Sequence, residues 1–232
     1  LDQLSLLLAV RDHLGAAVPG LDTSRILYEG TSMGGFLGME FLSFAPEVEA
    51  AFLQVPGSGI VDTLYHSAIW PLFSGILPAG VSAGESGALL GAAMMMLDRT
   101  ENALVIDRVR ALGTPVRIVY GASDGIVPNT STDRMLRLLA SPVVGPIKVV
   151  APTAAPDGVA VEGVDRDPFA PDRVATQIDT WGEQQTWLGP LLTHLSFLDQ
   201  SPMEDLGAWL DRRVVCRRDP GGPQQCERVA AG

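Results

Sequence analysis

Apolar and polar residues follow two different periods along the first half of the chain. Residues 1–15 carry apolar side chains at helical spacing, and residues 25–30 form a short apolar run of β-prone residues. Residues 33–44 have a helical pattern, and apolar strand candidates follow at residues 50–57 and 114–121. Helices that alternate with continuous apolar strands predict a parallel sheet covered by helices on both faces.

The alternation continues less regularly in the second half. Residues 132–140 and 201–214 have helical patterns, and residues 145–152 form another apolar strand candidate. Ser201 is placed to cap the last of these helices. From about residue 152 to 190 the chain is polar, acidic and rich in proline, which predicts a long insertion.

These patterns predict one α/β domain with two additions. Its core is expected in residues 1–58 and 101–214, with the long insertion at about 152–190. Residues 59–100 are expected to form a cap or lid inserted into the domain, and residues 215–232 a C-terminal tail. The 232 residues of the chain are enough for one large domain with a sizeable core.

Composition and charge narrow the choice of partners. Hydrophobic residues make up 47% and charged residues 19%, as in globular proteins. The net charge of −11, without a cluster of basic residues that would displace counterions from phosphates, argues against nucleic acid and anionic membranes as partners. The longest apolar region, residues 71–97, is interrupted by Pro78 and Glu85, which argues against a stable membrane span.

The two cysteines, Cys216 and Cys226, enclose a turn-rich loop. A zinc site would need further ligands that the neighbouring sequence lacks, so we predict a local disulfide. Because reducing compartments rarely keep such a bond, the prediction extends to a secreted or extracytoplasmic location in a bacterium. The alternative is a pair of free thiols in a frayed tail.

The clearest chemical motif is G-x-S-x-G, formed by Gly30, Thr31, Ser32, Met33 and Gly34. A strand candidate ends before it and a helix begins after it, as a turn that presents a nucleophilic serine requires. Such a turn strains the backbone of the serine, and glycines at both outer positions relieve steric clashes. The N–H of Met33, at the start of the helix, would help to stabilise an oxyanion. The alternative is a plain glycine-rich turn.

A serine hydroxyl needs a base, usually a histidine held by a carboxylate, to act as a nucleophile. Of the three histidines, only His194 comes after the last strand candidate and before the terminal helix, and we predict that it is the base. Asp124 directly follows the strand at 114–121 and is the predicted acid, with Asp62 as the alternative. Both could instead have structural roles, the histidine packed in a loop and the aspartate in a turn.

The order Ser32, Asp124, His194, the GTSMGG turn and the YGASDGIVP loop resemble an α/β-hydrolase, nearest to bacterial esterases and lipases. The resemblance implies the α/β-hydrolase fold, a Ser-His-Asp triad, and no metal or organic cofactor. It also implies that residues 59–100 form a helical lid. The family, however, rarely has some forty residues between its last strand and the histidine.

In this family the lid covers the active site. Trp70, Phe73 and Met95 could therefore line an acyl pocket, because apolar and adaptable side chains suit varied acyl chains. These residues could equally pack the lid onto the core or onto another chain.

The resemblance also implies several strands before the nucleophile strand, and one loop among them would give the second oxyanion N–H. This sequence offers only one helix there. We therefore expect the first strands to be absent from this chain and supplied by a missing N-terminal segment or a companion chain.

The sequence thus predicts a serine hydrolase that cleaves small-molecule or lipid esters of hydrophobic acids. The alternatives are a catalytically silent binding or assembly module, and a peptidase or amidase of the same fold. Asn129, Thr130 and Ser131 also match a glycosylation sequon, to which the sequence gives no role.

Overall fold

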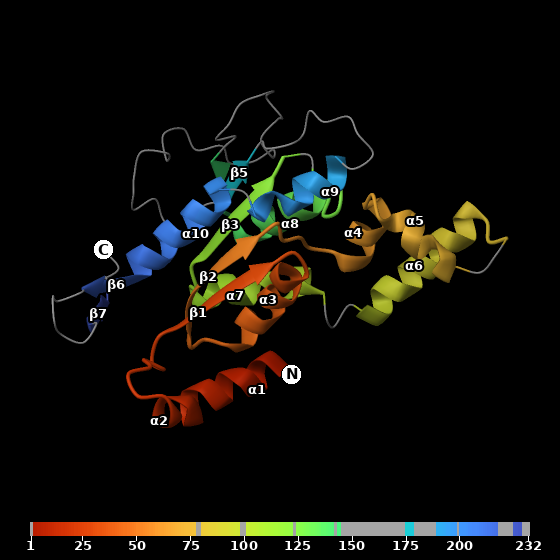
Figure 1. Cartoon of the computed structure of the whole chain (residues 1–232). Coiled ribbons are helices and arrows are strands. Elements are labelled where there is room, and N and C mark those ends of the chain that lie inside the picture. The colour runs from red at the N-terminus through yellow and green to blue at the C-terminus, as the bar shows by residue number, and fades with distance from the viewer. Residues whose placement is uncertain are drawn as a thin grey trace.

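The computed structural model contains one five-stranded parallel sheet, in the order β1-β2-β3-β5-β4 (Figure 1). The strands are β1 (Ile26–Thr31), β2 (Val48–Gln54), β3 (Val116–Gly121), β4 (Val143–Val144) and β5 (Ala175–Ile178). The structure describes residues 2–77, 80–97, 101–122, 124–141, 143–144, 175–178, 189–198, 200–217 and 225–228. Within these residues β1 is an edge strand.

Helices lie before, between and after the strands of the sheet along the chain. The first part of the chain has α1 (Asp2–Ala9), the π-helical η1 (Val10–Leu14), α2 (Gly15–Ala17) and α3 (Met33–Phe44). After β2 come α4 (Ile60–His66), α5 (Trp70–Phe73), the 3-10 turn η2 (Ser74–Ile76), α6 (Ala83–Leu97), the 3-10 turn η4 (Asn102–Leu104) and α7 (Ile106–Leu112). The remaining elements are α8 (Asn129–Leu139), α9 (Gly189–His194), the 3-10 turn η6 (Leu195–Leu198), α10 (Gln200–Arg213) and the strands β6 (Val214–Arg217) and β7 (Gln225–Arg228).

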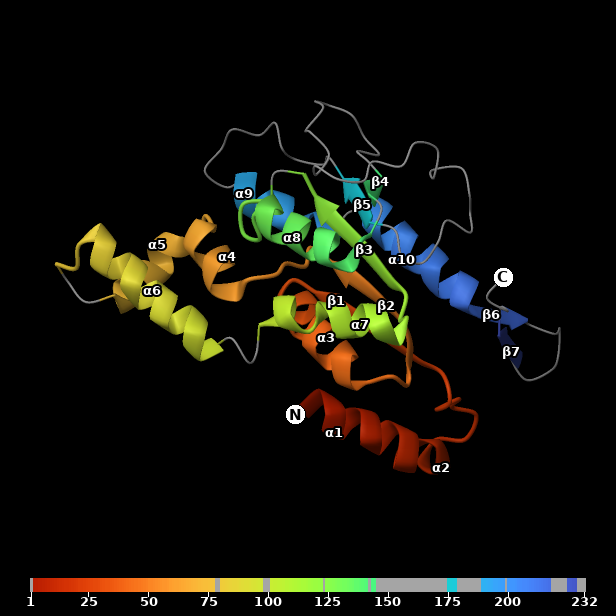
Figure 2. The same cartoon turned by 180° about the vertical axis from the view of Figure 1, so that it is seen from behind.

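β2 and β3, in the middle of the sheet, are buried on both faces, which explains why these strands are largely apolar. Helices α1, α3, α7 and α8 contribute to the larger core cluster on one face, whose fully buried members include Met39, Leu42, Leu53, Ile118 and Met135. On the other face α10 packs Trp209 against Phe52, with ring centroids 5.5 Å apart. The predicted parallel sheet with helices on both faces is confirmed (Figure 2).

A partly buried ion pair also ties α10 to the sheet. The guanidinium of Arg117, on β3, donates to both carboxylate oxygens of Asp205 at 2.8–3.1 Å and to the hydroxyl of Thr176 on β5 at 2.7 Å. Arg117 is only 8% exposed, so its partners satisfy a charge that would otherwise be costly to bury.

Two expectations from the sequence need correction. The insertion predicted at about 152–190 contains a strand of the main sheet, because β5 pairs with β3 on one side and β4 on the other. α10 begins at Gln200, so Ser201 lies inside the helix and not at its cap. The strand candidate at 145–152 lies outside the described residues.

The segment predicted as a cap forms α4, α5, η2 and α6, which lie to one side of the sheet in both views (Figures 1 and 2). Glu101 holds the two ends of this segment together, because its carboxylate accepts hydrogen bonds from the N–H groups of Gly59 and Ile60 at 2.7 and 2.9 Å. α6 has no buried residue.

Two further observations concern partners. Within the described ranges no helix is both long and apolar enough to cross a membrane. Strands β6 and β7 form an antiparallel pair whose register puts the backbone of Cys216 opposite that of Cys226.

Candidate active site

Ser32 connects β1 to α3 through a strained turn. Its backbone angles are φ 52° and ψ −112°, which residues with a side chain rarely adopt. Main-chain hydrogen bonds hold the turn: Ser32 N–H donates to the carbonyl of Gln54 at 2.8 Å, and Ser32 C=O accepts from Gly35 N–H at 2.8 Å. The strand and helix that the motif required are both present.

Gly30 allows the first turn of α3 to approach β1 closely. A Cβ at Gly30 would lie 2.6 Å from the carbonyl oxygen of Gly34 and 2.7 Å from the ring of Tyr28. A Cβ at Gly38 would also meet that ring, at 2.5 Å. Gly34 is different, because a Cβ there would meet nothing within 4 Å. The expectation that both outer glycines of the motif relieve clashes is therefore correct for Gly30 and wrong for Gly34.

Tyr28 fastens this contact by a hydrogen bond. Its hydroxyl donates to the carbonyl of Gly34 at 2.8 Å, and its ring packs against Phe41 of α3. Burial raises the pKa of Tyr28, an effect opposed by a hydrogen bond from Gln3 and increased by the nearby charge of Glu29. The hydroxyl therefore keeps the proton that it donates. This role was not predicted from the sequence, where the only signal was the position of Tyr28 in the strand before the motif.

His194 links the serine to the acid. Its Nε2 lies 2.9 Å from Ser32 Oγ, and its Nδ1 lies 2.8 Å from Asp124 Oδ2. His194 ends α9 and is only 7% exposed, and the ring of Phe197 lies edge-on to it at 6.3 Å. With its proton on Nδ1, the imidazole donates to the carboxylate and leaves Nε2 free to accept the serine proton.

Asp124 is held in a fixed orientation. Its Oδ1 accepts hydrogen bonds from the N–H groups of Ile126 at 2.8 Å and Val127 at 3.0 Å, while Oδ2 faces His194. Asp124 is 6% exposed, so these donors satisfy a buried carboxylate. The structure thus brings together the three residues that the sequence singled out.

The alternative acid, Asp62, lies elsewhere. It forms an ion pair with Arg134, and Nδ1 of His66 lies 3.1 Å from Asp62 Oδ1. His66 is on the cap, and its side chain is 57% exposed. Met33, the predicted oxyanion donor, is the first residue of α3, where N–H groups have no acceptor within the helix.

The base of the cap contacts the loop that carries Asp124. Ser67 Oγ donates to the carbonyl of Ile126 at 2.7 Å, and Ala68 N–H donates to the carbonyl of Gly125 at 2.6 Å. Of the three predicted pocket residues, Trp70 lies two positions after Ala68 in the chain, and its ring packs on that of Tyr65. Phe73 and Met95 are 39% and 77% exposed, and Met95 lies on the outlying α6.

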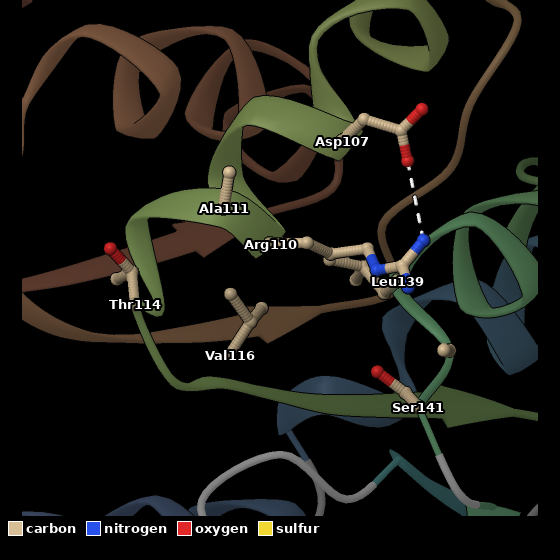
Figure 3. Close-up of a pocket in the computed structure, with 8 residues that line it drawn as sticks. Asp107, Arg110, Ala111, Thr114, Val116, Leu139 and Ser141 are labelled. Carbon is tan, nitrogen blue, oxygen red and sulfur yellow. Dashed lines mark hydrogen bonds and ion pairs between the residues drawn. The ribbon is translucent and has the colours of Figure 1, made fainter.

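Three cavities formed by the described residues lie away from the triad. One, of about 520 Å³, is lined by residues of α7, the start of β3 and the end of α8, including Arg110, Val116 and Ser141 (Figure 3). It lies at the amino end of β3, whereas Asp124 follows the carboxyl end. The other two border α1, and none of the three is lined by Ser32 or His194.

Comparisons with known proteins find similarity to solved structures, two of which are distant neighbours. The sequence matches no protein-family model and no curated protein. Among solved structures it is similar to the uncomplexed acylaminoacyl peptidase of Pyrococcus horikoshii, with 12% identity and a TM-score of 0.45 over 84% of this chain and 26% of that one. It is also similar to a puromycin hydrolase mutant complexed with PGG, with 21% identity and a TM-score of 0.37 over 57% of this chain and 18% of that one. The chain therefore spans about a quarter of the first protein and less than a fifth of the second.

The chain's own geometry defines its fold. A parallel sheet, a strained serine turn between β1 and α3, and an acid and a histidine that follow later strands occur in the predicted order. This is the α/β-hydrolase fold, with a helical insertion after β2, as the sequence predicted.

The contrast between the two outer glycines gives a test. We expect Gly30→Ala to lower the free energy of unfolding by about 1–3 kcal/mol, because the added methyl group collides with the backbone at Gly34. Gly34→Ala is the matched control, and it should be neutral or stabilise by up to about 1 kcal/mol, since helical Ala is favoured over Gly. Urea unfolding measures both, and equal free energies would contradict the packing described above.

Proposed function

We propose that the chain is a serine hydrolase that cleaves carboxylic esters through an acyl-enzyme intermediate. The observation that carries the proposal is the continuous hydrogen-bonded chain from Ser32 Oγ through His194 to Asp124, with distances of 2.9 and 2.8 Å. A serine, a base and an orienting carboxylate in this arrangement are the groups that acyl transfer requires.

In the first half of the reaction, Ser32 Oγ attacks the carbonyl carbon of the ester while His194 Nε2 takes its proton. Asp124 stabilises the resulting imidazolium through Nδ1–H. The negative charge on the carbonyl oxygen would be stabilised by the N–H of Met33 and the positive end of α3. The tetrahedral intermediate then collapses, and the leaving alcohol receives the proton from Nε2.

The second half repeats these steps with water as the nucleophile. His194 removes a proton from water, the hydroxide attacks the acyl carbon, and Ser32 Oγ leaves with the proton that His194 returns. No step requires a metal or an organic cofactor.

We propose esters as the substrate class because the cap has apolar side chains near the loop that carries Asp124. Trp70 lies two residues after the hydrogen bond that joins Ala68 to Gly125, and with Phe73 it would contact a hydrophobic acyl chain. Met95 would join them only if α6 moves toward the triad. Neither named neighbour is similar enough to decide between esters and amides, so a peptidase or amidase activity stays the second candidate.

The alternative is that the chain is a catalytically silent binding module and not an enzyme. It is supported by three cavities of about 480–520 Å³ elsewhere in the described residues, whose linings include neither Ser32 nor His194. Reactivity of Ser32 toward a fluorophosphonate separates the two proposals, because only an activated serine is labelled.

We also propose that another segment covers the edge of β1 with which no strand of the described residues pairs. An apolar groove of about 480 Å³ runs along this strand and is lined by Leu6, Val10, Leu14, Leu21 and Leu27 among others. An open strand edge beside apolar side chains invites pairing. An added strand, from a preceding segment or a companion chain, would satisfy the free backbone groups and could bring the second oxyanion donor.

The cysteines support export of the protein. Directly opposed residues of an antiparallel pair have Cα atoms about 4.5–5.5 Å apart, within the range that a disulfide spans. We propose that Cys216 and Cys226 form this bond and that the protein works outside the cytoplasm.

Substitution of Ser32 by Ala tests the catalytic proposal. It should lower kcat for p-nitrophenyl butyrate by more than about 10⁴-fold and abolish fluorophosphonate labelling, since the nucleophile is lost. Ser5→Ala, at an exposed position on α1, is the control and should behave as wild type. Equal hydrolysis by wild type and Ser32→Ala would refute the proposal. A higher kcat/KM for an acyl p-nitroanilide than for the ester would assign the chain to the amidase class.

Hydrogen exchange tests the proposed partner strand. In this chain alone, backbone amides of β1 that face the free edge should exchange faster than those of the central strand β2. When the covering segment is present, β1 should become as protected as β2. Full protection of β1 in the isolated chain would rule out an open edge.

Thiol alkylation tests the disulfide. Under denaturing conditions without reductant, iodoacetamide should modify neither Cys216 nor Cys226, and after reduction it should modify both. Modification of both without reductant, in protein purified from the periplasm or culture medium, would show that the thiols are free.

A further inference from the structure

Asn129, the asparagine of the sequon, uses both ends of its side-chain amide in the loop that carries the acid. Its Oδ1 accepts a hydrogen bond from Asp124 N–H at 3.0 Å. Its Nδ2 donates to the carbonyl of Gly121, also at 3.0 Å. Gly121 ends β3, so a single amide group connects the end of the strand to the backbone of the acid.

This connection differs from the hydrogen bonds to the Asp124 carboxylate. Those come from Ile126 and Val127, within the same loop, and they orient the carboxylate relative to the loop only. The hydrogen bond from Asn129 to the carbonyl of Gly121 fixes the loop relative to the sheet. The position of Asp124 relative to His194 depends on both.

The amide itself is held by a rigid element. Asn129 is the first residue of α8, and this helix is fixed on the sheet by the buried side chains of Met135 and Leu136. The start of α8 therefore cannot shift without disturbing the core. A short side chain on a fixed helix is well suited to set a backbone position, since it has few rotatable bonds.

We propose that Asn129 is a positioning residue for catalysis, which fixes the place of the Asp124 carboxylate against Nδ1 of His194. This inference rests on the proposed serine hydrolase function. Loss of the amide would let the loop shift, lengthen the Asp124–His194 hydrogen bond and weaken the base, without removing any group that contacts the substrate.

The expected result of Asn129→Ala is a selective loss of turnover. We expect kcat for p-nitrophenyl butyrate to fall about 10–100-fold with KM little changed, since misplacement by about 1 Å can have an effect of this size. Ser131→Ala is the matched control on the same helix. It removes buried hydrogen bonds to Ser58 and Thr63 and none to the Asp124 loop, so it should lower stability and leave kcat of the folded protein unchanged.

A double-mutant cycle separates positioning from general damage. If Asn129 acts through the acid, Asn129→Ala should change kcat by less than about 2-fold in an Asp124→Ala background, because interacting residues are not additive. An equal loss in both backgrounds would overturn the proposal, as would wild-type kcat in Asn129→Ala.

A proton NMR measurement tests the same inference without catalysis. The Nδ1–H of His194, hydrogen-bonded to Asp124, should give a downfield resonance that is absent from Asp124→Ala. We expect this resonance to persist in Ser131→Ala and to move upfield or disappear in Asn129→Ala. An unchanged resonance in Asn129→Ala refutes the positioning role. If wild type hydrolyses no ester, the proposed function fails, and the resonance still decides the role of Asn129.

Discussion

The site depends on the strained backbone of Ser32. Its angles, φ 52° and ψ −112°, carry a cost on the order of 1–3 kcal/mol for a residue with a side chain. Hydrogen bonds to Gln54 and Gly35 on either side hold the turn, and Tyr28 fastens the first turn of α3 to β1. Without this support the chain would relax, and the hydroxyl would leave the reach of His194.

The parallel sheet brings the strained serine turn and the loop of the acid to the same edge. Ser32 follows β1, Asp124 follows β3, and the carboxyl ends of parallel strands lie at one edge of the sheet. β2 and β3 are buried on both faces, by Met39 and its neighbours on one side and Trp209 on the other, so their register cannot slip without exposing core residues. The same packing that stabilises the fold therefore keeps the acid and the serine in register.

The cap is joined to this edge at its base. Ser67 and Ala68 donate hydrogen bonds to the loop of Asp124, and Glu101 holds the two ends of the inserted segment together. The far helix, α6, buries none of its residues. The cap thus contacts the acid loop directly, while most of its apolar surface lies outside the core.

The sequence by itself determined the local features. Largely apolar runs marked β2 and β3, because these strands are buried on both faces, a short β-prone run marked β1, and the glycine pattern marked the turn at Ser32. The place of Asp124 directly after a strand and of His194 before the terminal helix also selected these two residues, which lie 70 positions apart in the chain and which the structure brings together. Only the tertiary structure decided the rest. β5 has four residues in a polar, proline-rich segment, too few for a periodic pattern, and pairing with β3 and β4 makes it a strand. The contact between Gly38 and the ring of Tyr28 was also decided by the tertiary structure. Periodicity indicates which face of an element is buried, whereas the close approach of two elements depends on how they pack.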